Sequence, residues 1–368
     1  MGIRYLNKFL RNECKNSITI NKLSDLSGKK IAVDISIYLY RFASEGTLLE
    51  NIYLMLSLFR HYNITPIFVF DGKPPAEKKE LLVKRREDKI TAENEYKQLQ
   101  EQLKTEGNNM DEDDKQELIS SMDMLKKQFV YISKSKIETV KELIRLYGAT
   151  YYDAPGEADE LCALLVLKKK VCACLSEDMD LFVYGCPVVL RYLSLMNHTV
   201  VTYNMKGILE ELGLTQKEFR DICVLSGTDY NLYTNLKETK VPTLDKTLKH
   251  FKKYLKYKKE LGEQLENTFG LTIDTSGNIK KNKNIKQKVL IKETNINEFA
   301  CDFYEWLNEN SDYIENYDML NKINSIFDLS HYKHDKLKIF ERIKILNGPI
   351  MYEQIKPILE EDGFVFAF

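Results

Sequence analysis

Three short apolar runs in the chain predict buried strands, and an acidic residue follows each of them. Continuous runs of four to eight β-branched and other apolar residues are typical of strands that are covered on both faces. The three runs lie within "KKIAVDISIYLY" and end at Asp34, within "TPIFVFDG" and end at Asp71, and within "VCACLSEDMDLFVYG", where Glu177, Asp178 and Asp180 follow.

Helical periodicity separates these predicted strands. Sheet strands that alternate with amphipathic helices predict an α/β fold, with a mostly parallel central sheet and helices on both faces. Gly148 stands where a helix C-cap is expected. The apolar positions that share a helix face are Ile52, Leu54, Met55, Leu58 and Phe59 in one segment, and Ile137, Val140, Leu143, Ile144 and Tyr147 in the other.

The strand pattern stops between about residues 73 and 136. This stretch is charged and rich in glutamine, and "TEGNNMDEDDK" breaks it in the middle, so it predicts two exposed helices joined by a polar link. An exposed helical hairpin without a function is the simpler interpretation. After Asp229 the chain becomes helical and rich in lysine, which indicates either a solvated face or contacts with phosphates.

Composition narrows the class of protein. The chain of 368 residues is 43% hydrophobic and has a formal net charge of −1, so any nucleic-acid contact must come from local basic patches rather than from a global field. The seven cysteines form no C-x-x-C pair, which favours reduced thiols in an intracellular protein, nuclear or cytoplasmic, over disulfides or zinc. No apolar run approaches the length of a membrane span, so we expect no membrane association.

The acidic residues form a constellation. The carboxyl ends of parallel strands line one edge of a sheet, so acids from three strands should converge there. Glu157 and Asp159 in "APGEADE" lie at a predicted helix start, and Asp229 in "LSGTDY" follows an apolar helix that begins with a Thr215…Glu218 capping box. Any one of these acids alone is more simply a cap of the next turn.

So many carboxylates in one place would repel one another and raise one another's pKa. Divalent cations relieve this repulsion, and an oxygen-only donor set without histidine or thiolate favours Mg²⁺ or Mn²⁺ over zinc. The number of acids suits two Mg²⁺ ions about 3.5–4 Å apart, the arrangement that cleaves phosphodiesters, with Mn²⁺ as a substitute.

Over about residues 1–230 the sequence resembles the flap endonucleases and related structure-specific 5′-nucleases. The resemblance lies in the order and spacing of "MGIRYLNKFL", "VDISIYLYRF", "FVFDGKPPAEKKELLVKRRE", "APGEADELCALL", "SEDMDLFVYG" and "LSGTDY". Asp159 stands where the family usually has glutamate, so its shorter side chain would need a bridging water. The metal ligands that the resemblance implies are Asp34, Asp71, Glu157, Asp159, Asp178, Asp180 and Asp229.

The resemblance also assigns basic and substrate-binding residues. Lys78 and Arg85 match the family's cations at the scissile phosphate, and their seven-residue spacing would place both on one helix face. Tyr40 matches an aromatic residue that stacks on a terminal base, although it could instead be an ordinary core residue. The full set implied to contact substrate is Gly2, Tyr40, Glu157, Gly227 and Asp229.

Parts of the chain depart from the family pattern. The loop from Tyr40 to Ile52 is short, and "NLYTNLKETKVPTLDKTLKHF" has no glycine where the family has a glycine-rich helix-hairpin, so a potassium site is unsupported. No sliding-clamp motif is recognisable near residue 368. We predict a nuclease domain over residues 1–250, with an arch at about 73–136 and a divergent helix-hairpin region at about 229–250, followed by a lysine-rich helical region over 251–368.

The resemblance implies a monomeric, Mg²⁺-dependent nuclease that cuts branched DNA with a 5′ single strand near the junction, by attack of a metal-activated water. A 5′ exonuclease or Holliday-junction resolvase of the same superfamily is an alternative. A noncatalytic protein that binds junctions is another, although the complete set of acids argues against it.

Overall fold

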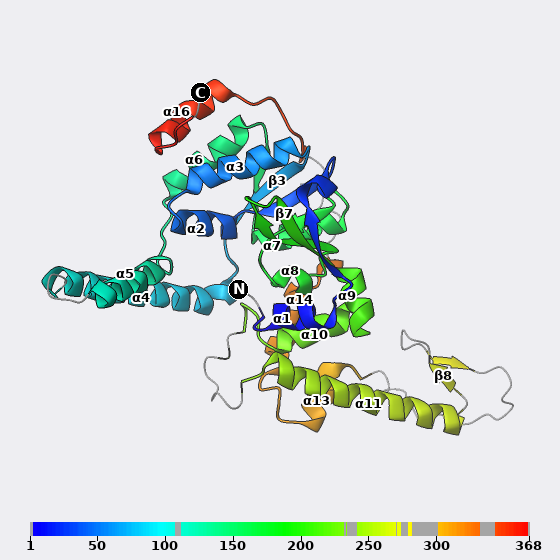
Figure 1. Cartoon of the computed structure of the whole chain (residues 1–368). Helices are drawn as coiled ribbons and strands as arrows, with labels where there is room; N and C mark the ends of the chain where they lie inside the picture. Colours follow the sequence, from blue (N-terminus) through cyan, green and yellow to red (C-terminus); the bar gives the residue numbers. More distant parts are fainter. Residues whose placement is uncertain are drawn as a thin grey trace. The chain divides into compact units, whose positions relative to one another are not determined.

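The structure is a computed structural model that describes residues 3–106, 112–231, 233, 241–269, 271–273, 279–281, 301–331 and 343–366 (Figure 1). The chain forms two compact units, one made of Leu10–Leu212 with Leu329–Phe368 and the other of Gly2–Phe9 with Gly213–Asp328. This division into compact units does not test the predicted end of the nuclease domain at residue 250, so that boundary stays a prediction.

A mixed sheet forms the centre of the larger unit. Among the described residues it has seven strands in the order β1-β7-β6-β5-β2-β3-β4, and every neighbouring pair from β6 to β4 is parallel. The pairs β1–β7 and β6–β7 are antiparallel, so the prediction of a mostly parallel sheet is confirmed. The strands are β1 (Ile18–Lys22), β2 (Lys30–Asp34), β3 (Thr65–Phe70), β4 (Thr150–Asp153), β5 (Ala173–Leu175), β6 (Val188–Ser194) and β7 (Thr199–Asn204).

Helices cover both faces of this sheet. Ile31 and Val33 of β2 belong to the core that α3 and α6 complete, whereas the Cys174 thiol of β5 interacts with Cys162 of α7 on the opposite face. In the described part of the chain no helix is both long and apolar enough to span a membrane. The helices around the sheet are η1 (Leu23–Leu26), α2 (Ser36–Ser44), α3 (Leu48–His61), α6 (Lys134–Leu146), α7 (Ala158–Leu167), α8 (Asp180–Val183) and α9 (Met205–Leu212).

The two predicted amphipathic helices are α3 and α6. Burial on α3 follows the predicted positions except for Leu54, which is 40% exposed, so the prediction that it shares the buried face is wrong. Leu54 precedes the buried Met55 and turns about 100° away from it along the helix. Gly148 has a φ of +80° directly after α6 and its cap, so the predicted helix end is confirmed.

The charged stretch forms a helical hairpin, as predicted. η2 (Ala76–Lys78) leads into α4 (Lys79–Glu106), and α5 (Glu112–Lys126) packs along α4 (Figure 1). The rings of Tyr96 and Phe129 meet edge to face, with centroids 5.4 Å apart. Part of the predicted polar break, residues 107–111, lies outside the described residues.

A segment near residue 350 returns to the larger unit and packs on α3 and α6. It contains α16 (Tyr352–Glu361), and η4 (Leu329–His331) precedes it in the sequence. The Arg60 side chain of α3 donates two hydrogen bonds through Nη2, to the carbonyl oxygens of Tyr147 at 3.0 Å and Gly348 at 2.6 Å. Gly148 accepts a further bond from the Gly348 amide. Backbone polar groups of this segment are therefore satisfied by the helices that it covers.

The second unit is mostly helical. Its helices and short strands are α10 (Gln216–Leu225), α11 (Leu244–Phe269), β8 (Leu271–Ile273), β9 (Ile279–Lys281), α13 (Phe303–Asn310) and α14 (Tyr317–Ile326), and α1 (Leu6–Glu13) begins in this unit and continues into the larger one. The predicted capping box of Thr215 and Glu218 opens α10. The region predicted to replace the helix-hairpin falls largely on residues 232 and 234–240, which lie outside the described residues.

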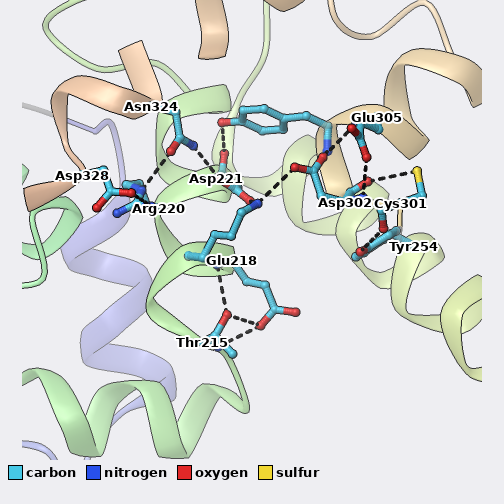
Figure 2. Close-up of polar contacts among 12 residues, drawn as sticks. Thr215, Glu218, Arg220, Asp221, Tyr254, Cys301, Asp302, Glu305, Asn324 and Asp328 are labelled. Atoms are coloured by element: carbon cyan, nitrogen blue, oxygen red, sulfur yellow. Dashed lines mark hydrogen bonds and ion pairs between the residues drawn. The ribbon is translucent and has the colours of Figure 1, made fainter. Parts of the chain in front are cut away.

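A buried carboxylate links the helices of this unit (Figure 2). Asp221 of α10 accepts from Lys217 at 3.0 Å and from Asn324 of α14 at 2.5 Å, and its backbone carbonyl accepts from the Tyr304 hydroxyl of α13 at 2.7 Å. Lys217 also contacts Asp302, the N-cap of α13, at 3.2 Å. Satisfying each polar group in this way removes the penalty of an unpaired buried charge.

We expect Arg60→Ala to lower the free energy of unfolding by roughly 2 kcal/mol, because it leaves two partly buried carbonyl groups without their charged donor. Arg145→Ala is the matched control, since Arg145 on α6 only forms an exposed ion pair with Glu142 and should change stability by about 0.5 kcal/mol or less. Urea unfolding of the two variants measures the difference. Equal losses would contradict the role given to Arg60.

Candidate active site

The sheet brings the predicted acids to one edge. β5, β2 and β3 are adjacent parallel strands, so their carboxyl ends point the same way. Asp34 is the last residue of β2, Asp71 follows β3, and Asp178 and Asp180 follow β5. Glu157 is the N-cap of α7, which contacts these strands, and Asp159 lies in its first turn. Six of the seven predicted metal-binding acids therefore belong to the larger unit and come from elements that meet at this edge.

Two serines hold the strand-end acids in place. The Ser176 hydroxyl donates to Asp34 Oδ2 at 2.8 Å and accepts from the Asp178 amide at 3.0 Å, so it joins the ends of β2 and β5. The Ser36 hydroxyl donates to Asp71 at 2.5 Å. The sequence analysis missed both serines, because no periodic pattern in the sequence marks a hydroxyl that donates to a distant acid.

Asp71 also caps a helix. Its Oδ1 accepts from the Ala158 amide at 2.9 Å, at the first residue of α7. A carboxylate at this position satisfies one of the free N–H groups and complements the positive end of the helix. Asp71 is therefore a helix cap, but it caps α7, the helix that carries Asp159, and not the turn that follows β3 as the simple interpretation had it.

Gly72 lets the chain leave β3 beside α7. Its amide donates to the Gly156 carbonyl at 2.7 Å, and a Cβ at this position would lie 1.9 Å from the Ala154 carbonyl oxygen. No side chain fits in that space. In "DGKPP", Asp71 is therefore followed by a glycine whose backbone lies against that of Ala154 and Gly156. This approach places the loop before α7 against the start of the arch.

The carboxyl of Asp34 is buried among like charges. Burial raises its pKa to about 7, the negative charge of Asp71 and then that of Asp178 add to the rise, and the hydrogen bond from Ser176 opposes it. A carboxyl group with this pKa is only partly ionised near neutral pH. The site therefore holds more negative charge than its own groups neutralise.

Lys78 lies within the cluster of acids rather than on the surface of the arch. Its side chain is buried, and its ammonium lies 2.8 Å from Glu157 Oε1. Burial alone would lower the pKa of Lys78, but Asp159, Asp180 and Glu157 raise it above its ordinary value. Lys78 therefore stays charged and acts as the internal counter-ion of three acids.

One ammonium cannot neutralise all of these carboxyl groups. Burial raises the pKa of Asp159 well above its ordinary value, Lys78 opposes the rise, and Glu157, Asp178 and Asp180 add to it. Burial and the neighbouring acids thus favour the protonated form of Asp159, and the same acids favour the charged form of Lys78. A multivalent cation would relieve the repulsion among these carboxyl groups.

A buried arginine supports the loop that carries Asp178. Arg191 of β6 donates to the Glu177 carbonyl at 2.8 Å, and its Nε lies 3.4 Å from the Glu177 carboxylate. The same carboxylate accepts from the Tyr192 amide at 2.5 Å. Sequence reasoning noted Glu177 but missed Arg191, for which a single arginine inside the apolar run "VVLRYL" is the available signal.

The basic arch residues differ in their surroundings. Arg85 lies on α4 and is half-buried, whereas Lys78 ends the 3₁₀ turn η2, so the two do not lie on one continuous α-helix as their spacing predicted. Lys79 and Arg86 next to them are exposed. Tyr40 on α2 is 49% exposed, which excludes the interpretation of an ordinary core residue. Gly2 lies outside the described residues.

Asp229 and Gly227 belong to the second unit, in a loop fixed by its own hydrogen bonds. Gly227 has a φ of +102°, and Asp229 is buried. The backbone amide and hydroxyl of Thr228 donate to Asn231 Oδ1 at 2.8 and 2.7 Å, and the Asn231 side chain donates to the Tyr233 hydroxyl at 2.9 Å. Side-chain hydrogen bonds thus connect Thr228, Asn231 and Tyr233 after α10, while the role of Asp229 with the other acids stays a prediction.

The donor set suits Mg²⁺, but the described residues do not form a ready-made chelate. No three histidine, cysteine or acidic side chains among them lie together in a way that could hold a metal ion. Mg²⁺ keeps several of its waters and commonly binds through one or two carboxylates together with substrate phosphates, so a closed protein cage is not required. Oxygen-only donors with raised pKa values at Asp34 and Asp159 fit such an ion.

Comparison with known proteins identifies the family. The XPG N-terminal domain matches residues 1–92, and the XPG I-region matches residues 148–229. Flap endonuclease 1 of Encephalitozoon cuniculi is 35% identical over 247 residues, which cover 62% of this chain and 68% of the relative. The chain belongs to the flap endonuclease family. Flap endonuclease 1 of Homo sapiens is 34% identical over 248 residues, which cover 62% of each chain.

Solved structures agree on the fold of this family member. The catalytic core of Rad2 in complex with a DNA substrate has a TM-score of 0.57 at 18% identity and covers 99% of this chain and 96% of that one. Human GEN1 in complex with Holliday junction DNA has a TM-score of 0.53 at 17% identity, with coverage of 98% and 74%. The matched region spans about 62% of the length of the first curated relatives.

We expect the metal-free protein to lose stability as the pH rises from about 4 to 7. The folded pKa of Asp34 is raised to about 7, so in this window the folded state binds more protons than the unfolded state, and each rise in pH favours unfolding. The contribution of Asp34 is at most roughly 4 kcal/mol. Urea unfolding in EDTA at several pH values measures it.

Asp34→Asn should flatten this pH dependence, because the amide does not ionise. Asp153→Asn is the control, since Asp153 ends β4 but is exposed and paired with Lys141 at 2.8 Å. A wild-type profile that Asp34→Asn leaves unchanged would show that Asp34 does not carry the effect.

Proposed function

We propose that this protein is a Mg²⁺-dependent, structure-specific 5′-nuclease that hydrolyses a phosphodiester near a junction of single-stranded and double-stranded DNA. The observation that carries the proposal is the convergence of carboxylates at the ends of β5, β2 and β3, with the buried ammonium of Lys78 among them. The crowding of like charges supports the proposal, since Asp71 and Asp178 raise the pKa of Asp34, and Glu157, Asp178 and Asp180 raise that of Asp159.

The residues of the larger unit that would hold the ions are Asp34, Asp71, Glu157, Asp159, Asp178 and Asp180. Asp229 is assigned to the same role by the family resemblance alone. Bound divalent ions supply Lewis-acid activation of water and neutralise charge on the phosphate. The family-level pattern supports two ions, because the acids are more numerous than one ion needs. Ser36 and Ser176 would keep Asp71 and Asp34 oriented for such a role.

The cations of the arch would act on the reacting phosphate. Lys78 of η2 extends into the cluster of acids, and Arg85 follows it in the sequence on α4. A cation fixed beside the scissile phosphate stabilises the charge that grows in the transition state. Tyr40 has an exposed ring on α2 that can take a terminal base by stacking. Cleavage would leave a 5′-phosphate and a 3′-hydroxyl, as the family resemblance implies.

The substrate is branched DNA with a 5′ single strand, and the proposed roles lie in replication, repair or recombination. A panel of flap, gapped, overhang, duplex and Holliday-junction substrates, with and without Mg²⁺, tests this directly. Cleavage that requires a free 5′ end supports flap activity. Preferential cutting of four-way junctions would favour the resolvase instead, and binding without any cutting would identify a noncatalytic junction binder.

We expect Asp180→Asn to abolish flap cleavage and to remove the rise in melting temperature that Mn²⁺ causes. Asp180 is fully buried beside Lys78, so an isosteric amide removes a ligand charge while keeping the side-chain volume. Flap affinity in EDTA should change little, because phosphate contacts elsewhere provide most of it. Asp153→Asn, at the end of β4, should cleave and respond to Mn²⁺ as the wild type does. Normal turnover in Asp180→Asn would disprove the metal site.

We expect Lys78→Ala and Arg85→Ala each to slow single-turnover cleavage about a hundredfold or more while changing flap affinity only modestly. Loss of a donor that acts in the transition state commonly costs on the order of 3 kcal/mol. Lys79→Ala and Arg86→Ala are the matched controls, because both side chains are exposed next to the tested ones. Equal rate losses in all four variants would indicate diffuse electrostatic attraction by the arch.

A further inference from the structure

A lysine of the arch lies close to two exposed tyrosine rings. The Lys89 ammonium of α4 is 4.8 Å from the ring centroid of Tyr40 on α2 and 5.3 Å from that of Tyr131, which lies between α5 and α6. Tyr131 is 63% exposed and Tyr40 49% exposed. Each ring therefore shares one part of its surface with the cation and presents the rest to solvent.

Hydrogen bonds fix this arrangement at the base of the arch. Lys89 Nζ donates to the Val130 carbonyl at 2.9 Å, and the Tyr131 hydroxyl donates to Glu93 of α4 at 3.3 Å. Three elements that are distant in the sequence thus meet at one ammonium group. The hydrogen bond to Glu93 and the contact with Lys89 hold the Tyr131 side chain beside α4.

The ammonium of Lys89 is not fully compensated in this arrangement. Burial lowers its pKa, and the positive charge of Arg85, four residues earlier on α4, lowers it further. A carbonyl and two aromatic rings offer only partial negative charge in return. The Glu93 carboxylate, which accepts from the Tyr131 hydroxyl, is paired with Lys97 at 2.8 Å, so an anion that approached Lys89 would meet a nearby carboxylate whose charge is already compensated.

We propose that Tyr131 and Lys89 form a binding subsite for one unpaired nucleotide next to Tyr40. The base stacks on the exposed ring of Tyr131, and the phosphate of that nucleotide contacts the Lys89 ammonium. Stacking accepts any base, because every base has a π-face. The subsite would therefore select for an unpaired nucleotide and not for a particular sequence. The inference rests on the proposed function in one respect, namely that a single strand passes the arch.

Binding of single strands in EDTA tests the subsite without any cleavage. The probes are fluorescein-labelled dT20 and rU20, and the readout is the Kd by anisotropy with the full chain. Tyr131→Ala and Tyr131→Leu should each weaken binding by about 5- to 100-fold, because both lack an aromatic face. Tyr131→Phe should stay within about twofold of the wild type. Tyr352→Ala on α16, a tyrosine of similar exposure, is the matched control and should bind normally.

The salt dependence of the same binding tests Lys89. Loss of one phosphate contact reduces the log–log slope for single strands by about 0.7. Lys89→Ala should show this reduction, whereas Lys89→Arg, which keeps the charge, and Lys356→Ala on α16 should not. Melting curves of Lys89→Ala show whether the arch stays folded. The Tyr131 variants, which change an exposed side chain, test the subsite independently of that result.

The outcomes test the proposed subsite independently of the proposed nuclease activity. Wild-type affinity in both Tyr131→Ala and Tyr131→Leu, or an equal loss in Tyr131→Phe, would overturn the subsite even if the protein cuts flaps. A selective loss of binding in the nonaromatic variants would support it even if the wild type cuts nothing. A loss for only one of dT20 and rU20 supports the subsite and assigns it to strands with that sugar.

Discussion

The balance of charge at one edge of the sheet is the constraint on which the rest of the site depends. Glu157, Asp159 and Asp180 face a single buried ammonium, that of Lys78. Removing any of these charges from water is costly, and their mutual attraction offsets the cost only when the numbers match. Burial, with neighbouring negative charge in second place, raises the pKa of both Asp159 and Asp34 above that of ordinary carboxyl groups. The folded chain therefore concentrates negative charge at one edge of the sheet.

Rigid elements maintain this unfavourable arrangement. Asp34 is the end of a central strand that is paired on both sides, and Ser176, directly after the neighbouring strand β5, donates a hydrogen bond to it. Asp71 is held by the N-terminus of α7, and Arg191 of β6 fixes the loop that follows β5. Like charges would otherwise move apart, since a flexible loop relaxes at little cost. Functional groups are held most accurately when strands and helices, rather than loops, carry them.

The three central strands and the acids at their ends could be predicted from the sequence. The apolar runs of β2, β3 and β5 are continuous because helices cover both faces of the sheet, and an acid after each run marks the shared edge. Leu54 shows the limit of periodicity, because an apolar residue beside a buried one can still face solvent. Ser36, Ser176 and Arg191 could not be found in this way, since their partners are distant in the sequence. The spacing of Lys78 and Arg85 suggested a shared face but gave no indication that Lys78 is buried.

The arch shows why the cations were harder to place than the acids. An acid at or just after a strand end has a short side chain that stays near the sheet edge, whereas a lysine side chain can follow several paths from its helix. Lys78 reaches the carboxylates, while Lys89, eleven residues later, lies against two rings and a backbone carbonyl. Arg85 lies between them in the sequence and disfavours the charged form of Lys89. Like charges on one helix are destabilising, so the cations of the arch and the acids at the sheet edge each concentrate charge of one sign.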